Sequence, residues 1–276
     1  MYPPPGQFAP EFFLLQREGY LFRACLINGL NSLRWATASD PGRFYSAFFD
    51  LSIGIERTLK SIIVVDMLAR GEATTNHKLR HYSHDLNALF NKVSELRGAR
   101  NETGIHPLAV FGSDSIERDL IAFLSDFAIR TRYFNLDALS SPQTVVDPLV
   151  KWGELLKRLV RENVSASRAR RIVEESNALA SILEDSTFVM RHDLDGTQMD
   201  LEAMLATPRL QELGCRYAVY HVIRIIDGLR EAISNVMYRA IQREAGHAPA
   251  IVPHMYEFLD FAYANRTYVL RKKRWP

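Results

Sequence analysis

Cysteine is scarce in this sequence. Only Cys25 and Cys215 occur among 276 residues, and neither belongs to a Cys-x-x-Cys pair. Two isolated thiols exclude a disulfide framework and a cysteine-based zinc site. Because unpaired cysteines are typical of proteins in reducing compartments, we expect the chain to be cytoplasmic.

Long uncharged apolar runs are also missing. No stretch reaches the roughly 18 residues that a membrane-spanning helix needs. The N-terminal segment MYPPPGQFAPEFF lacks the basic region and the apolar run of a secretory signal. The net charge is only +2, with both signs well mixed, which excludes a strongly cationic binder of DNA or membranes. We therefore expect a soluble protein with no membrane partner.

Strand signals are almost absent as well. No Asn-Gly or Asp-Gly pair lies between segments of alternating polarity, whereas apolar residues recur at helical spacing along most of the chain. Three pairs place a capping side chain before a proline, which suits a helix start. These pairs are Asp40–Pro41, Asp147–Pro148 and Thr207–Pro208. The sequence therefore predicts an all-α protein.

The periodicity also predicts how the helices follow one another. The expected helices cover about residues 11–37, 40–71, 85–96, 113–133, 147–162, 165–183 and 207–244, before a last helix that ends in RKKRWP. A seam near 163–170 divides the chain into two expected regions. The first, 1–163, is a helical bundle with an N-terminal arm and helix; the second, 164–276, is a helical region that packs on it.

Three histidines gather in HKLRHYSHDLNALF, at positions 77, 81 and 84. On one helix face they could bind zinc, with water or a carboxylate as fourth ligand. The helical pattern is weak before Asp85, however, and no HExxH-type base accompanies the histidines. The alternative is that His84 and Asp85 meet the free backbone N–H groups of a helix start. We expect no shared metal and no cofactor.

The order of motifs around this stretch carries a resemblance. A helix with IERTLKSIIVVDMLARG holds Glu56 and Lys60 four residues apart, HDLNALF opens the next helix, and FAIRTRYFNLDAL ends a later one. An E-x-x-x-K helix, an H-x-L-x-x-L helix start and an Arg-Tyr pair in this order resemble the HEPN superfamily over residues 43–163. The resemblance implies an up-and-down four-helix bundle, often dimeric. Such domains are associated with RNA cleavage, with nucleotide binding beside a nucleotidyltransferase, and with antiviral and toxin systems.

The resemblance also implies a substrate-binding site at one end of that bundle. The residues expected to converge there are Lys60, His84, Arg130, Arg132 and Tyr133. Cations, an imidazole and an aromatic ring suit a phosphate and a stacked base. The alternative is structural: the pair formed by Glu56 with Lys60 is a surface helix pair, and Arg130 or Arg132 pairs with Asp126 or Asp137.

Ribonucleases of this superfamily use an arginine and a later histidine with four to six residues between them. Cleavage without a metal needs an imidazole to move a proton and a cation to hold the phosphate. Three pairs have this spacing, about as many as chance supplies: Arg70 with His77, Arg100 with His106, and Arg216 with His221. The candidate catalytic residues are Arg100, His106, Arg216 and His221, and whether the protein is an enzyme stays open.

These observations lead to two hypotheses. The first is an HEPN-like protein that binds RNA or a nucleotide, as a divergent or degenerate ribonuclease of a bacterial defence or toxin–antitoxin type system. The second is a non-catalytic helical module that docks a partner protein. In either case we expect a homodimer, because Asp66 is the only charge in the apolar run SIIVVDMLA. The basic end RKKRW either contacts nucleic acid, with Trp275 stacking on a base, or is a solvated tail.

Overall fold

The computed structural model describes residues 8–72, 81–141, 145–183, 189–244 and 249–276. Within these ranges every regular element is helical, so the predicted all-α class is confirmed. None of the described helices is long and apolar enough to cross a membrane.

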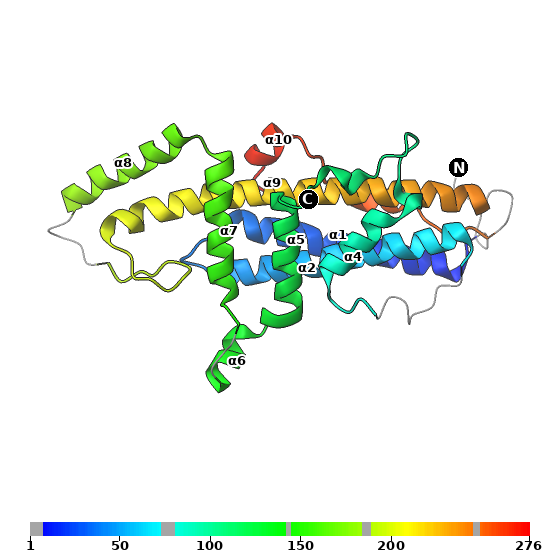
Figure 1. Cartoon of the computed structure of the whole chain (residues 1–276), viewed down its shortest axis with the longest axis horizontal. Helices are drawn as coiled ribbons and strands as arrows, with labels where there is room; N and C mark the ends of the chain where they lie inside the picture. Colours follow the sequence, from blue (N-terminus) through cyan, green and yellow to red (C-terminus); the bar gives the residue numbers. More distant parts are fainter. Residues whose placement is uncertain (1–7, 73–80, 142–144, 184–188, 245–248) are drawn as a thin grey trace.

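Three long helices form the frame of the molecule. α1 (Pro10–Trp35), α2 (Gly42–Arg70) and α9 (Leu201–Glu244) run along its long axis and contact one another (Figure 1). α5 (Ile116–Asp126) and α7 (Pro148–Asn163) run across them. The remaining helices are α4 (Leu86–Glu95), α6 (Phe134–Ser140), α8 (Ala166–Leu183) and α10 (Arg266–Arg271). Short 3₁₀ turns cover Arg97–Ala99, Pro107–Val110 and Met255–Leu259.

Two glycines let α1 and α2 approach closely. A Cβ atom on Gly29 would lie 2.6 Å from Cγ of Leu51, and one on Gly54 would lie 2.8 Å from Cγ of Leu26. Each glycine thus faces a leucine of the other helix, and the two contacts are reciprocal. Any larger residue at either position would push the helices apart.

Only one of the three predicted capping pairs begins its helix as expected. Oδ1 of Asp147 accepts from the backbone N–H of Leu149 at 2.7 Å, which confirms this cap. The prediction at Asp40 is wrong, because its carboxylate pairs with the side chain of Arg43 at 2.7 Å and α2 begins at Gly42.

The third pair lies inside a helix rather than at its start. α9 begins at Leu201, where Oδ1 of Asp200 accepts from the N–H of Ala203 at 2.7 Å, and Pro208 belongs to its interior. A proline in a helix interior forfeits one backbone hydrogen bond. Here Leu201 and Ala206, which both precede Pro208, are buried and hold the first turns of the helix in place.

The main hydrophobic cluster extends from Leu15 on α1 to Trp275 near the C-terminus, and a small second one joins Ala180 of α8 to Leu201 of α9. Trp152 of α7 is one of the two tryptophans in the main cluster, with ring centroids of Phe48 and Phe123 at 5.0 Å and 5.1 Å. The apolar run SIIVVDMLA on α2 is covered from within the chain by α1 and α9, so its burial does not depend on a second copy. The division of the chain near 163–170 stays a prediction.

The basic C-terminal segment is fixed to α1. Trp275 is buried, and its backbone N–H donates to Oδ1 of Asn31 at 2.8 Å. Arg34 donates to the carbonyl oxygens of Lys272 at 3.0 Å and Leu270 at 3.3 Å. The expected stacking of Trp275 on a base is therefore wrong, because its ring is part of the core, and the alternative of a solvated tail is equally wrong.

Candidate functional site

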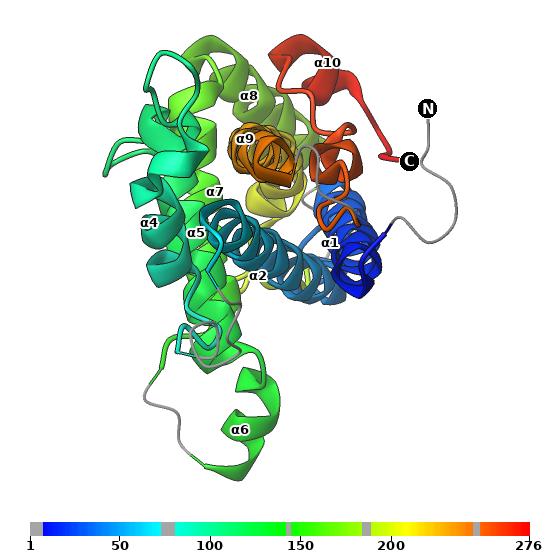
Figure 2. The same cartoon turned by 90° about the vertical axis from the view of Figure 1, so that its right-hand side faces the viewer.

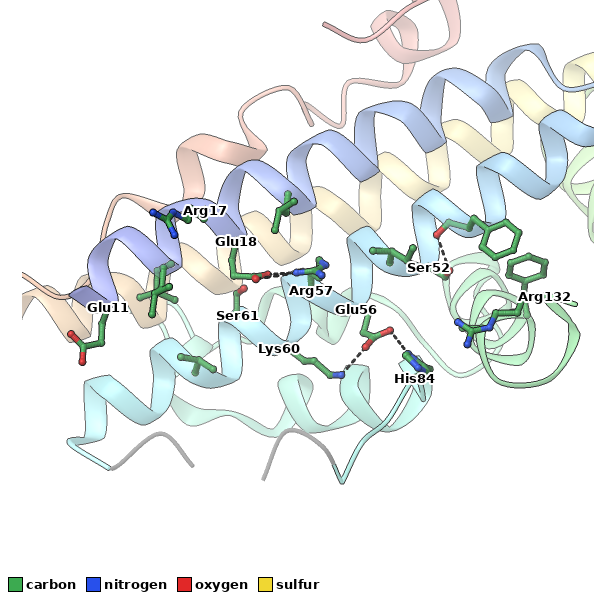
Figure 3. Close-up of a pocket in the computed structure, with 18 of the residues that line it drawn as sticks. Glu11, Arg17, Glu18, Ser52, Glu56, Arg57, Lys60, Ser61, His84 and Arg132 are labelled. Atoms are coloured by element: carbon green, nitrogen blue, oxygen red, sulfur yellow. Dashed lines mark hydrogen bonds and ion pairs between the residues drawn. The ribbon is translucent and has the colours of Figure 1, made fainter. Parts of the chain in front are cut away.

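A groove of about 980 Å³ is hollowed into the described part of the chain. It lies between α1 and α2, and it ends at the start of α4 and at the turn that follows α5 (Figure 3). We call it the α1–α2 groove. Its apolar wall includes Leu14, Leu21, Phe49, Ile53, Val64 and Phe127. The groove therefore offers apolar surface, with charged side chains placed along its length (Figure 3).

Glu56 is the centre of a charged cluster in the groove, which it forms with Lys60 and His84. Its Oε1 lies 2.7 Å from Nζ of Lys60, and its Oε2 lies 3.0 Å from Nδ1 of His84 (Figure 3). Nζ of Lys60 also donates to the carbonyl oxygen of Ser83 at 2.8 Å. Glu56 and Lys60 thus join the middle of α2 to the residues just before α4, and hold the His84 imidazole at the groove.

Asp85 makes the cap that the sequence predicts for the start of α4. Its Oδ1 accepts from the N–H of Ala88 at 3.0 Å and from the hydroxyl of Ser125 at 3.2 Å. The same hydroxyl accepts from the N–H of Leu86 at 3.0 Å. The cap therefore also fixes the last turn of α5 against the first turn of α4. His84 takes no part in it, since its ring contacts Glu56.

A π-helical turn over Phe127–Thr131 follows α5 and decides where Arg132 points. A π turn holds one more residue than an α turn, so it changes the angular position of every following side chain. Arg132 consequently lines the groove beyond His84 (Figure 3). Its guanidinium lies 5.2 Å from the ring of Tyr133 and has no ion pair among the described residues.

The other two predicted binding residues lie outside the groove. Nε of Arg130 donates to Oδ1 of Asp126 at 2.5 Å, and the second oxygen of that carboxylate takes Lys151 at 2.6 Å. This is the structural alternative considered for Arg130. Tyr133 is largely exposed beside Arg132 and does not line the groove. Of the five residues, Lys60, His84 and Arg132 come together and Arg130 and Tyr133 do not.

The α1 side of the groove was not predicted. Nη1 of Arg57 lies 2.7 Å and 2.9 Å from the two carboxylate oxygens of Glu18, which joins α2 to α1 across the groove. Arg17 also lines it. Arg57 directly follows Glu56 in the sequence, but α1 lies outside residues 43–163, so no motif connected it with Glu18.

The candidate catalytic pair Arg100 and His106 is built into a loop. His106 is buried: its Nε2 donates to the carbonyl oxygen of Val93 at 2.8 Å, and its Nδ1 accepts from the N–H of Leu108 at 3.1 Å. Burial lowers the pKa of the imidazole, which matches a neutral ring whose two nitrogens each form one hydrogen bond. A proton shuttle at His106 would require both bonds to break.

The second candidate pair lies on α9, away from the groove. Arg216 pairs with Glu212, while His221 is buried with its Nδ1 2.7 Å from Oε1 of Glu117. Arg224 binds the same carboxylate oxygen. Burial raises the pKa of Glu117, but the hydrogen bond and charge of His221, together with Arg224, outweigh burial and lower this pKa below its ordinary value.

No metal centre is evident among the described residues. Within them, no three side chains of His, Cys, Asp or Glu are grouped so that they could hold a metal ion. His77 lies outside the described residues, and so does its pairing with Arg70. The expectation that the three clustered histidines share no metal therefore stays a prediction.

Comparison with known proteins adds no assignment. No protein-family model, no curated protein and no solved structure matches this chain. The chemistry of the α1–α2 groove is therefore the starting point for a functional proposal.

Proposed function

We propose that the α1–α2 groove binds a nucleotide or a short segment of RNA. The observation that carries this proposal is the presence of Lys60, His84 and Arg132, from three different elements, in one groove whose walls also carry apolar and aromatic side chains. A ligand that has both a phosphate and an apolar, planar part matches this combination of cationic and apolar side chains. Phosphate needs cationic donors, and a base needs apolar or aromatic surface.

Arg132 is the main phosphate anchor in this proposal. Its guanidinium has no carboxylate partner within the described residues, so binding an anion breaks no existing ion pair. The planar fork of arginine also matches two phosphate oxygens at once. Lys60 and His84 already share Glu56, whose negative charge opposes a phosphate, so their contribution is smaller. Phe49 and Ile53 of α2 then provide the surface for the base.

Cleavage of RNA is not part of this proposal. Arg100 with His106 and Arg216 with His221 lie outside the groove, and both histidines are buried. The HEPN-like bundle of residues 43–163 is proposed as the fold context of the site. Contacts of α2 with α4 and α5, of α4 with α5, and of α5 with α7 support it. A cytoplasmic location fits a role on RNA and stays a prediction.

A matched pair of arginines tests the binding site. Arg132→Ala is expected to weaken binding of a labelled RNA oligonucleotide at least tenfold, since a charge-assisted hydrogen bond contributes about 1.5–3 kcal/mol. Arg130→Ala removes an equal charge two residues away, where it is held by Asp126, and is expected to leave the affinity unchanged. Fluorescence anisotropy gives the affinity and a thermal melt checks the fold. Equal affinities for both variants and the wild type contradict the proposal.

The second hypothesis, docking of a partner protein, is favoured by α6. This helix buries none of its residues and projects from the body of the molecule (Figure 2). Leu136 and Leu139 on it are 67% and 86% exposed, and because they are three residues apart they form one small apolar face for a partner to cover. The proposed homodimer is the simplest partner arrangement, with α6 at the contact between copies.

Light scattering tests the dimer. The expected mass is twice the chain mass of 31.6 kDa at tens of micromolar protein, and Leu136→Asp combined with Leu139→Asp is expected to return it to the monomer value. The matched control is Leu179→Asp combined with Ile182→Asp, which charges the exposed leucine and isoleucine of α8. A wild-type protein of monomer mass contradicts the dimer.

A further inference from the structure

The C-terminal segment from Tyr263 to Arg274 forms a basic and aromatic surface, which we call the tail surface. Its cations are Arg266, Arg271, Lys272, Lys273 and Arg274. Within the described residues none of them has a carboxylate at ion-pair distance, although the whole chain has nearly as many acidic as basic residues, 32 against 34. Unpaired cations this dense in sequence create a local positive potential that favours an anionic ligand.

The backbone that carries these cations is held in place. Arg34 of α1 donates to the carbonyl oxygen of Lys272 at 3.0 Å, and Nε1 of Trp35 donates to that of Lys273 at 3.1 Å. The buried ring of Trp275 fixes the segment from the other side. Because the backbone is ordered before a ligand arrives, binding costs less conformational entropy than it would for a loose tail.

The tail surface is also hollowed and carries exposed rings. A shallow depression of about 910 Å³ is lined by Tyr263, Asn265, Thr267, Tyr268, Arg271 and Lys272. Tyr263 is 67% exposed, and Nζ of Lys272 lies 4.7 Å from the ring centroid of Tyr268. Asn265 and Thr267 add hydrogen-bonding groups between the rings and the cations. The single carboxylate in the depression belongs to Asp260.

We propose that the tail surface binds a single-stranded polynucleotide. The cations match the phosphodiester backbone, and the exposed ring of Tyr263 offers a face on which a base can stack. A lipid surface is disfavoured because the tail surface has no exposed aliphatic side chain to insert; Val269 is buried. A duplex is disfavoured because its bases are already stacked on each other.

This site is separate from the α1–α2 groove. The groove contacts α1 as far as Leu21, whereas Arg34 anchors the tail surface thirteen residues further along the same helix. At the helical rise per residue this is about 20 Å. The inference therefore does not rest on the proposed function of the groove, and it stands if the Arg132→Ala experiment fails.

The salt dependence of binding tests the charges. The probe is a fluorescein-labelled oligouridylate of about 12 nucleotides, within the usual site size of single-strand binders. Arg271→Gln, Lys273→Gln and Arg274→Gln together are expected to reduce the slope of log affinity against log salt by about 2, since each phosphate contact contributes about 0.7. The matched control changes three exposed arginines of α7 and α8 that have no described ion pair, Arg161→Gln, Arg168→Gln and Arg170→Gln. It is expected to keep the wild-type slope.

The exposed ring gives a second, charge-neutral test. Tyr263→Leu is expected to weaken binding about tenfold by removing one stacked base, whereas Tyr263→Phe keeps the ring and the affinity. Because Tyr263 is largely exposed, neither change is expected to alter the melting temperature.

Four results overturn the inference. The first is an unchanged salt slope in the triple variant, and the second is an equal fall of that slope in the arginine control. The third is an equal affinity of Tyr263→Leu and Tyr263→Phe for the oligouridylate. The fourth is binding to phosphatidylserine vesicles that depends on the tail surface, while binding to the oligouridylate does not depend on it.

Discussion

Glu117 is the residue whose loss we expect to destabilise the fold most clearly. It is 2% exposed at the start of α5 and accepts from Nδ1 of His221 at 2.7 Å and from Arg224, both on α9. The contact joins α5, which runs across the three long helices, to α9, which is one of those three (Figure 1). Glu117→Ala removes the shared acceptor and leaves two donors without a partner.

The magnitude follows from how deeply each donor is buried. Breaking a buried ion pair by removing one partner costs about 3–5 kcal/mol. The His221 side chain is only 8% exposed, so its Nδ1 has no access to water, whereas Arg224 is 33% exposed and can be partly solvated. We therefore expect the lower end, about 3 kcal/mol, which for a chain of this length is a fall in melting temperature of about 5 °C.

The assay is thermal unfolding followed by circular dichroism, with Glu212→Ala as the control. Glu212 forms an ion pair on the same α9 helix, but its own side chain is 51% exposed and that of its partner Arg216 is 34% exposed, so its loss is expected to cost less than about 1 kcal/mol. If Glu117→Ala melts as close to the wild type as Glu212→Ala does, the buried cluster does not stabilise the fold and the reasoning is refuted.

The lowered pKa of Glu117 adds a pH dependence with a defined sign. A carboxyl with a lower pKa in the folded than in the unfolded state stabilises the fold above its unfolded value, here 4.5, and this contribution is lost as the pH falls through the folded pKa. The difference in stability between the wild type and Glu117→Gln is therefore expected to be constant near neutral pH and to shrink below 4.5. A difference in stability between the two proteins that grows as the pH falls contradicts this prediction.

Three further changes test the packing. Gly29→Ala places a methyl group 3.0 Å from the backbone nitrogen of Leu51 and is expected to lower the free energy of unfolding, measured with denaturant, by about 1–3 kcal/mol. An unchanged free energy of unfolding would mean that α1 and α2 can separate freely. Trp275→Ala empties a core site and is expected to cost about 3–5 kcal/mol in the same assay, whereas a solvated tail would give no change. Burial raises the pKa of Cys215 to about 12, so a thiol reagent is expected to modify only Cys25 in the folded protein and both cysteines in denaturant, as counted by mass spectrometry.

Local chemistry made part of the fold predictable. Asp147 and Asp85 cap their helices as expected, because a cap depends on residues within one turn. Apolar spacing likewise predicts α2 and α8 to within a few residues. Pro208 misled the prediction of α9 because a proline suits a first turn, yet Asp200 supplies an earlier cap and the helix passes through.

The charged residues of the α1–α2 groove were predicted only in part, because some of them depend on tertiary packing. Lys60 and His84 could be connected through the motifs around Glu56, which lie on neighbouring elements. The choice between Arg130 and Arg132 could not be made, because the π turn that ends at Thr131 decides which of the two lines the groove. Such a turn depends on tertiary packing rather than on a local residue pattern.

The α1–α2 groove depends on parts of the chain that lie far outside the resemblance to an HEPN domain. One wall is α1, joined to α2 by the pair of Glu18 with Arg57, and α1 in turn is held by the C-terminal residues through Asn31 and Arg34. Residues 43–163 alone would expose the apolar face of α2 that α1 and α9 cover. The site is therefore a property of the whole chain: a change at the C-terminus that loosens α1 should disturb the groove without touching any residue that lines it.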